Sequence, residues 1–219
     1  MKPICHTLLP SRALIAIVTL ALMPTGSAGA DPISDANIFV YPKPLKVAEL
    51  VFGNQQGGSV SLKEYTGRVV LLHFWSINCP ACRMEEPLLH DLKRAFGGNG
   101  LEILGVNLVD PPQAAVSHAA RNRFPFPVLV AQQSGFSLQT VSLGTRQTSF
   151  LVNPMKEAIL EVPGFPTTYI IDCRGSAVAY SVGVARWDQS AARGFVQRLV
   201  TEAKTCAGPI RVGAAAPRR

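Results

Sequence analysis

Two cysteines separated by two residues are the part of this sequence best suited to chemistry: Cys79, Pro80, Ala81 and Cys82. They follow an apolar run and precede residues with helical periodicity, so we expect the pair where a buried strand ends and a helix begins. A helix N-terminus provides free N–H groups and the positive end of the helix dipole, and both stabilise a thiolate. Pro80 suits the first helical turn because its missing N–H has no role there. The spacing lets one thiol resolve a mixed disulfide formed by the other, so the pattern favours thiol–disulfide exchange.

Two other interpretations of the Cys79–Cys82 pair stay open. The pair also fits half of a zinc site, but Cys173 and Cys206 are single, far apart and without a histidine pair nearby, which is poor spacing for zinc. A purely structural disulfide is the other alternative, although structural bridges usually close longer loops. The expected position between strand and helix also favours catalysis over a structural disulfide.

The first 30 residues have the organisation of an export signal. Lys2 and Arg12 are basic, 13–23 is an almost unbroken apolar run, and 28–30 form an A-x-A cleavage site. We expect cleavage after Ala30 and export to the periplasm, an oxidising compartment. The apolar run is shorter than the about 20 residues that span a bilayer, but an uncleaved membrane anchor is the alternative interpretation.

Composition limits the classes of function. The chain has 219 residues, 47% hydrophobic and 16% charged, which is enough for one globular domain with a sizeable core. Its formal net charge is +7; residues 1–30 hold two of the basic residues and no acid, so the exported chain would carry +5. The basic residues are scattered and not interleaved with aromatic ones, so no nucleic-acid partner is expected. Cys5 leaves with the signal, and the remaining cysteines are too few for a disulfide-stapled miniprotein.

The elements expected around the cysteines alternate between strands and helices. We expect 31–44 to be an irregular lead-in and 45–65 to contain a hairpin with turns at Gly53-Asn54 and Gly57-Gly58. Periodicity then predicts strands at 68–75, 101–108, 126–131, 167–172 and 177–184, and helices at 84–96, 112–121 and 188–203. This alternation predicts a three-layer α/β domain over 45–206, followed by a flexible tail at 207–219.

Two segments of the chain resemble a known family. The run from Phe74 to Pro87, FWSINCPACRMEEP, resembles the active site of thioredoxin-like proteins, in particular the exported TlpA/ResA-like branch with F-W-x-x-x-C-x-x-C-R-x-E-x-P. Gly164 to Asp172 resembles the family's G-x-P-T-T-x-x-I-D element, whose proline is cis. Two motifs in the right order are more specific than C-x-x-C alone. The resemblance implies a three-layer thioredoxin fold, here with an N-terminal β-hairpin extension and an insertion before the cis-proline strand.

The resemblance implies roles for the matched positions. Cys79 would be the exposed attacking thiol and Cys82 the resolving thiol. Pro166, in cis, would lie beside the pair and leave the backbone before it open to an extended substrate, with Phe165 lining the substrate groove. The remaining active-site support would come from Trp75, Pro80, His73 and Glu85.

Three positions near the cysteines need separate interpretation. Asn78 stands where the family commonly has Trp, so the surface beside Cys79 is expected to be more polar. His73 stands where thioredoxin has a buried acid that helps proton transfer to the resolving thiol, and we hypothesise that His73 does part of this work because imidazole titrates near neutral pH. The favoured alternative is a core histidine hydrogen-bonded to a neighbour. Glu85 matches the family's acid and is expected to support the helix dipole rather than catalysis.

An insertion is expected at about 132–153. The stretch from Val130 to Pro166 is longer than the resemblance implies, and it is rich in Gln, Ser and Thr without a clear period. Long unpatterned insertions in compact domains are often functional. Because this one enters just before the cis-proline element, we expect it to select partners.

The other two cysteines are expected to pair. Cys173 ends the strand after the cis proline, and the last helix should return antiparallel to the next strand, which brings Cys206 near that turn. We therefore predict a structural Cys173–Cys206 disulfide, which would add about 3 kcal/mol through loop-closure entropy.

Together these expectations describe an exported thiol–disulfide oxidoreductase that uses the Cys79–Cys82 couple on protein disulfides and dithiols, without a bound cofactor or metal. The resemblance favours a reductase for cytochrome c or metalloprotein assembly, supplied by a membrane electron-donor protein. A disulfide-forming oxidant is one alternative, and a copper(I)-binding assembly chaperone using the same soft thiolates is another. A peroxidase of the peroxiredoxin type is disfavoured, because its reactive Cys lies in a different motif.

Overall fold

The computed structural model of this chain describes residues 33–130, 137–143, 146–152 and 158–206. The predicted signal segment 1–30 and the predicted tail 207–219 lie outside these residues. Within the described ranges, no helix combines the length and apolar character needed to cross a membrane.

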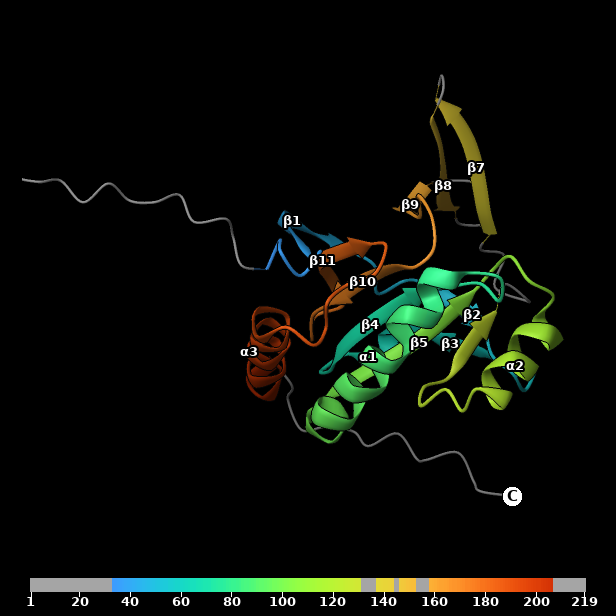
Figure 1. Ribbon diagram of the computed structural model, residues 1–219. Helices are drawn as coiled ribbons and strands as arrows, with labels where there is room; N and C mark the ends of the chain where they lie inside the picture. Colours follow the sequence, from blue (N-terminus) through green and yellow to red (C-terminus); the bar gives the residue numbers. More distant parts are fainter. Residues whose placement is uncertain (1–32, 131–136, 144–145, 153–157, 207–219) are drawn as a thin grey trace, which may run out of the picture.

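The central element of the fold is an eight-stranded sheet with the strand order β1-β11-β10-β4-β5-β6-β2-β3 (Figure 1). Its strands are β1 (Phe39–Lys46), β2 (Val51–Gly53), β3 (Ser59–Ser61), β4 (Val69–Phe74), β5 (Leu101–Asn107), β6 (Val128–Val130), β10 (Thr167–Ile171) and β11 (Ser176–Val182). Strands β4, β5 and β6 are parallel, and β10 pairs antiparallel with both β4 and β11. Every residue of β4 and β10 is buried, as expected for strands covered on both faces.

Three α-helices cover one face of this sheet: α1 (Pro80–Phe96), α2 (Pro112–Arg121) and α3 (Ser190–Cys206) (Figure 1). Leu89 and Leu92 of α1 and Val196 of α3 join Val69 and Leu71 of β4 in one core cluster. The buried alanines of α2 pack beside them, near the first turn of α1. The predicted strand–helix alternation is therefore confirmed for this part of the chain.

The opposite face is covered differently. Leu50, Leu62 of the 3₁₀ helix η1 (Leu62–Tyr65) and the second sheet's Leu151 and Leu160 pack against Leu72 of β4 and its neighbours. A further 3₁₀ helix, η2 (Gly97–Asn99), follows α1. The third layer of the predicted three-layer domain is therefore built from strands and a 3₁₀ turn in the described residues. The predicted N-terminal hairpin is confirmed, because β2 and β3 pair antiparallel and β2 joins the sheet beside β6.

The lead-in was predicted to be irregular over 31–44, and this is wrong for residues 39–44. These residues belong to β1, which pairs with β11 at the edge of the sheet. Pro42 and Pro44 are unfavourable in the interior of a sheet, so the sequence did not indicate a strand here. They are tolerated because an edge strand needs hydrogen bonds on one side only, and the register shifts between Val40 and Leu45, around the prolines.

The predicted insertion contributes a second sheet of three antiparallel strands: β7 (Ser137–Leu143), β8 (Arg146–Val152) and β9 (Ala158–Glu161). Residues 131–136, 144–145 and 153–157 lie outside the described residues. Figure 1 shows β7 and β8 projecting away from the main sheet. The sequence shows no clear period here. The described side chains of β7 agree with this, because Ser137 and Gln139 on one face and Thr140 and Ser142 on the other are all exposed.

Candidate active site

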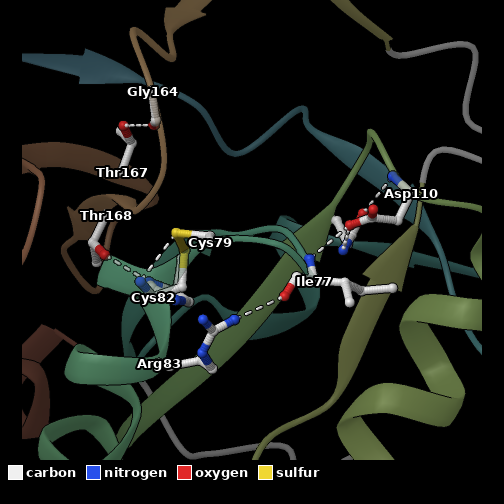
Figure 2. The surroundings of a disulfide bond; sticks show 10 residues. Ile77, Cys79, Cys82, Arg83, Asp110, Gly164, Thr167 and Thr168 are labelled. Atoms are coloured by element: carbon white, nitrogen blue, oxygen red, sulfur yellow. Dashed lines mark hydrogen bonds between the residues drawn. A yellow bond between two sulfur atoms is a disulfide. The ribbon is translucent and has the colours of Figure 1, made fainter.

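The cysteine pair lies at the N-terminus of α1, which follows β4 in the chain. Cys79 is the N-cap of the helix, Pro80 occupies the first turn, and the backbone N–H of Cys82 donates to Cys79 Sγ at 3.0 Å (Figure 2). The apolar strand and the Cys-Pro start signal thus produce the strand-to-helix junction that the sequence indicates. A sulfur at this position receives a helix N–H that has no partner within the helix.

Cys79 and Cys82 are joined as a disulfide, with their Cα atoms 5.2 Å apart. Both residues are buried, with 6% of the surface of Cys79 and 7% of that of Cys82 accessible to solvent. The expectation of an exposed Cys79 is therefore wrong for this oxidised form. The pair packs in a cluster with Trp75, and the partly buried Ile77 and Phe165 pack against this cluster.

The two sulfurs differ in their hydrogen bonding. Cys79 Sγ accepts the Cys82 N–H, and the first turn of α1 contains no acidic residue that would oppose a negative charge. The N-terminal end of the helix dipole adds to this effect. An N–H donor and a helix N-terminus are features that lower the pKa of a thiol, and the thiolate is the nucleophile in exchange.

Two side chains fix the loop just before Cys79 (Figure 2). The Ile77 N–H donates to Asp110 Oδ2 at 2.8 Å, and Arg83 Nη1 donates to the Ile77 carbonyl at 3.5 Å. Asn107 completes the arrangement, since its Nδ2 donates to Asp110 and its Oδ1 accepts the Asp110 N–H. Sequence reasoning missed these residues. The available signal was an Asn at the end of the buried strand β5 and an Asp three residues later. The C-terminal end of β5 lies at the same sheet edge as that of β4.

The second matched motif reaches this site from β10. The peptide bond between Phe165 and Pro166 is cis. Thr167 Oγ1 donates to the Gly164 carbonyl at 2.7 Å, and the Gly183 N–H donates to the Pro166 carbonyl at 2.8 Å. Phe165 is half-buried and contacts both the cysteine cluster and the core on the other face of the sheet. The structure thus brings the CPAC and Gly-Phe-Pro-Thr-Thr segments together.

His73 lies on β4 with its ring almost completely buried. Its Nδ1 is 2.9 Å from Thr168 Oγ1, and its ring packs edge-on against Phe126. Burial lowers the pKa of His73 to about 3, so the imidazole is neutral at neutral pH. This environment matches the alternative of a core histidine bonded to a neighbour.

Glu85 is buried in α1, one turn after Cys82. Its Oε1 accepts hydrogen bonds from Trp187 Nε1 at 2.6 Å and from the Ala185 N–H at 3.4 Å, while Oε2 has no partner among the described residues. Burial raises the pKa of Glu85 to about 7, against the two hydrogen bonds, which lower it. The predicted helix-dipole role does not fit, because Glu85 lies outside the first turn and its charged form is disfavoured. It bonds instead to the segment before α3.

Trp75 belongs to the same buried cluster as the two cysteines. Its ring packs against His118 and Phe124, with ring centroids 5.6 and 5.1 Å away. Gly105 of β5 makes room for it, because a Cβ there would meet Phe126 at 2.9 Å and Trp75 Nε1 at 3.2 Å. Trp75 Nε1 is buried without a hydrogen-bond partner in the described part of the chain. Within the same ranges, no three His, Cys, Asp or Glu side chains are grouped so as to hold a metal ion.

The predicted second disulfide is present in the structure. Cys173, in the turn after β10, is bonded to Cys206, the last residue of α3, with Cα atoms 6.1 Å apart. This disulfide ties α3 to the sheet at the end of the domain's chain path.

A disulfide at a helix N-terminus, beside a cis proline on this sheet, defines a redox-active site on a thioredoxin-like fold. The profile of the AhpC/TSA family matches residues 43–179, and the chain belongs to that family. Thiol-disulfide oxidoreductase ResA of Geobacillus thermodenitrificans is 30% identical over 122 residues, which are 54% of this chain and 70% of the relative. ResA of Geobacillus kaustophilus is 29% identical over 119 residues, 54% of this chain and 68% of the relative.

A solved structure agrees in fold. The thioredoxin domain of a thiol-disulfide oxidoreductase from Bacteroides vulgatus matches with a TM-score of 0.52 and 22% identity, over 73% of this chain and 99% of that domain. The predicted resemblance and fold are thereby confirmed. The protein is a thioredoxin-like thiol–disulfide oxidoreductase.

Proposed function

We propose that this protein is an exported reductase of protein disulfides that works through Cys79 and Cys82. The observation that carries the proposal is the position of Cys79 Sγ as the N-cap of α1, where it accepts the Cys82 N–H at 3.0 Å. This contact favours Cys79 as the thiolate that attacks and leaves Cys82 as the thiol that resolves.

The proposed reaction transfers two electrons to the client. In the reduced protein, the Cys79 thiolate attacks one sulfur of a client disulfide, forming a mixed disulfide and releasing a client thiolate, which takes up a proton. The Cys82 thiol loses its proton and attacks the Cys79 sulfur. This step closes the Cys79–Cys82 disulfide and releases the second client thiolate, which is protonated in turn. The client disulfide is reduced to two thiols, and the cysteine pair is oxidised.

A further turnover requires a dithiol donor that reduces the Cys79–Cys82 disulfide. We assign this role to a membrane electron-donor protein, and we place the protein in the periplasm, because residues 1–30 have the pattern of an export signal. Cytochrome c or metalloprotein assembly is the proposed process. The ResA relatives support the thiol–disulfide chemistry through their name.

Other residues of the site are proposed to support the reaction. Phe165 and Pro166 would form one wall of the client groove, since Phe165 lies over the cysteine cluster. Trp75 and Pro80 would hold the start of α1 in place. The insertion is proposed to select partners, and a deletion that leaves both generic reduction and partner selection intact would refute that role.

The first test is the reduction potential of the Cys79–Cys82 pair, measured against glutathione in the protein without residues 1–30. A reductase is expected at about −250 mV or lower, and a value near about −120 mV would identify a strong oxidant instead. The second test uses Cys82→Ser, which should accumulate a mixed disulfide with a client peptide through Cys79. The matched variant Cys79→Ser should trap none, and equal trapping by both would contradict the assigned roles.

A further inference from the structure

The two sheets end in four edge strands, and three of them are protected against pairing with another chain. β1 contains two prolines and two lysines and has a register shift, and β3 is only three residues long. β9 is four residues long, ends in Glu161 and also has a register shift against β8. Short strands, Pro, charges and bulges are the usual means by which proteins prevent edge pairing.

β7 has none of these protections. Its seven residues, SLQTVSL, include no charge, no proline and no glycine. Each of them pairs with β8 in an unbroken register, from Ser137 opposite Val152 to Leu143 opposite Arg146. Ser137, Gln139, Thr140 and Ser142 are exposed. Among the described residues β7 has a strand on one side only, so alternate N–H and C=O groups point away from β8.

The second sheet is also fixed to the segment that carries the active site. Leu160 of β9 and Val162 are buried in the core that Phe165 joins, and Phe165 also contacts the cysteine cluster. The Tyr169 hydroxyl of β10 donates to the Glu161 carbonyl at 2.6 Å. The chain passes directly from β9 through 162–164 to the cis proline. The sheet is therefore held at a defined position relative to Cys79.

We propose that the outer edge of β7 binds an extended, uncharged segment of the client polypeptide, which adds as a fourth strand while the client disulfide reacts at Cys79. This inference rests on the proposed function. A client segment is the occupant that fits this edge because the sheet that ends in β7 is joined through β9 and 162–164 to Phe165, which contacts the cysteine cluster. Strand addition recognises mainly backbone groups, so one edge serves clients of different sequence. β7 has no charged side chain that could pair with a charged client residue, so an uncharged segment is the occupant proposed.

The test compares two synthetic peptides, each with the same intramolecular disulfide. One carries a seven-residue uncharged, strand-forming tail, and in the other the tail contains alternating prolines. The reduced wild-type chain is expected to show a KM about tenfold lower for the strand-forming tail, with similar kcat; tenfold corresponds to about 1.4 kcal/mol of binding. Equal KM values for the two peptides would overturn the proposal.

Two neighbouring variants, Gln139→Pro and Thr140→Pro, locate the edge. Successive residues point their N–H groups to opposite sides of a strand, so one variant removes a donor from the outer edge and the other from the β7–β8 ladder. The outer-edge variant, recognised by its smaller change in unfolding midpoint, should raise KM for the strand-forming tail about tenfold. Its reaction with glutathione disulfide should be unchanged, and the matched control is a non-proline change at the same position, Gln139→Thr or Thr140→Gln.

Failure of the proposed function gives a different result. A wild-type chain that reduces neither peptide nor glutathione disulfide would refute the reductase, and anisotropy with a fluorescent cysteine-free tail peptide would still test the edge. Loss of that binding in the outer-edge variant supports the inference, and no binding to the wild type refutes it. A wild-type dimer that the same variant converts to a monomer would assign the edge to a second copy of the chain and overturn the proposal.

Discussion

Replacing Glu85 by Gln is expected to stabilise the oxidised protein increasingly as the pH rises. The pKa of Glu85 is raised by burial from 4.5 to about 7 in the folded state. The folded protein therefore binds the proton more tightly than the unfolded chain, and this contribution to stability is complete below about pH 4.5. It is lost as the pH rises through about 7, where the buried carboxylate becomes charged. Gln cannot ionise, so the variant escapes the loss.

The size of the effect follows from the difference between the two pKa values. Each pKa unit corresponds to about 1.4 kcal/mol, so the shift from 4.5 to about 7 amounts to about 3 kcal/mol. Gln also keeps an oxygen that can accept from Trp187 Nε1, and any penalty from its NH₂ group would be the same at every pH. The slope of the difference with pH is therefore the test, not its value at one pH.

The assay is urea unfolding of the oxidised wild type and Glu85→Gln between pH 4 and 8, with the free energy of unfolding extrapolated to water. Keeping both disulfides oxidised prevents thiol titration, and His73 contributes equally to both proteins. Glu202→Gln, an exposed site on α3, is the matched control. Parallel profiles for wild type and Glu85→Gln across this range would refute the reasoning about the buried carboxyl.

Three further predictions concern other parts of the site. Burial lowers the pKa of His73 to about 3, so its contribution to stability is present above about pH 6.5 and is lost as the pH falls. His73→Asn should therefore lose less stability on acidification than the wild type, as measured by urea unfolding. If the same variant leaves the pH profile of thiol–disulfide exchange unchanged, the hypothesis that His73 relays a proton is rejected. Asp110→Ala leaves the Ile77 N–H without its acceptor and should lower the free energy of unfolding by about 2 kcal/mol, whereas Asp110→Asn should lose less. The double variant Cys173→Ala/Cys206→Ala should lose about 3 kcal/mol in thermal or urea unfolding while its exchange with glutathione stays at the wild-type rate.

The strands and helices near the cysteines were predictable because their patterns are local. A continuous apolar run such as β4 and a helical period such as that of α1 are imposed by burial on both faces or on one face. The Cys-Pro-Ala-Cys start signal needs only its own residues to cap a helix. The edge strands β1 and β7 were missed for the opposite reason, because the prolines of β1 and the exposed residues on both faces of β7 leave no periodic pattern.

The environment of Glu85 shows what the sequence does not contain. One turn after Cys82, a glutamate between charged and apolar residues is compatible with an exposed helix face. Its burial depends on Trp187, more than a hundred residues later, whose indole N–H reaches Oε1 at 2.6 Å. The same holds for Asp110, which becomes part of the site only because β4 and β5 are parallel neighbours.

The sequence by itself therefore determined the redox chemistry, the helix that carries it and the family, because a dithiol, its cap and its motif are set by residues close together in the chain. Tertiary structure alone decided the proton affinities of His73 and Glu85, the anchoring of the loop before Cys79 and the exposed edge of β7. Burial and hydrogen bonding between distant segments set these properties. They arise only when the sheet is assembled, because the free energy of a charge or a polar group depends on everything packed around it.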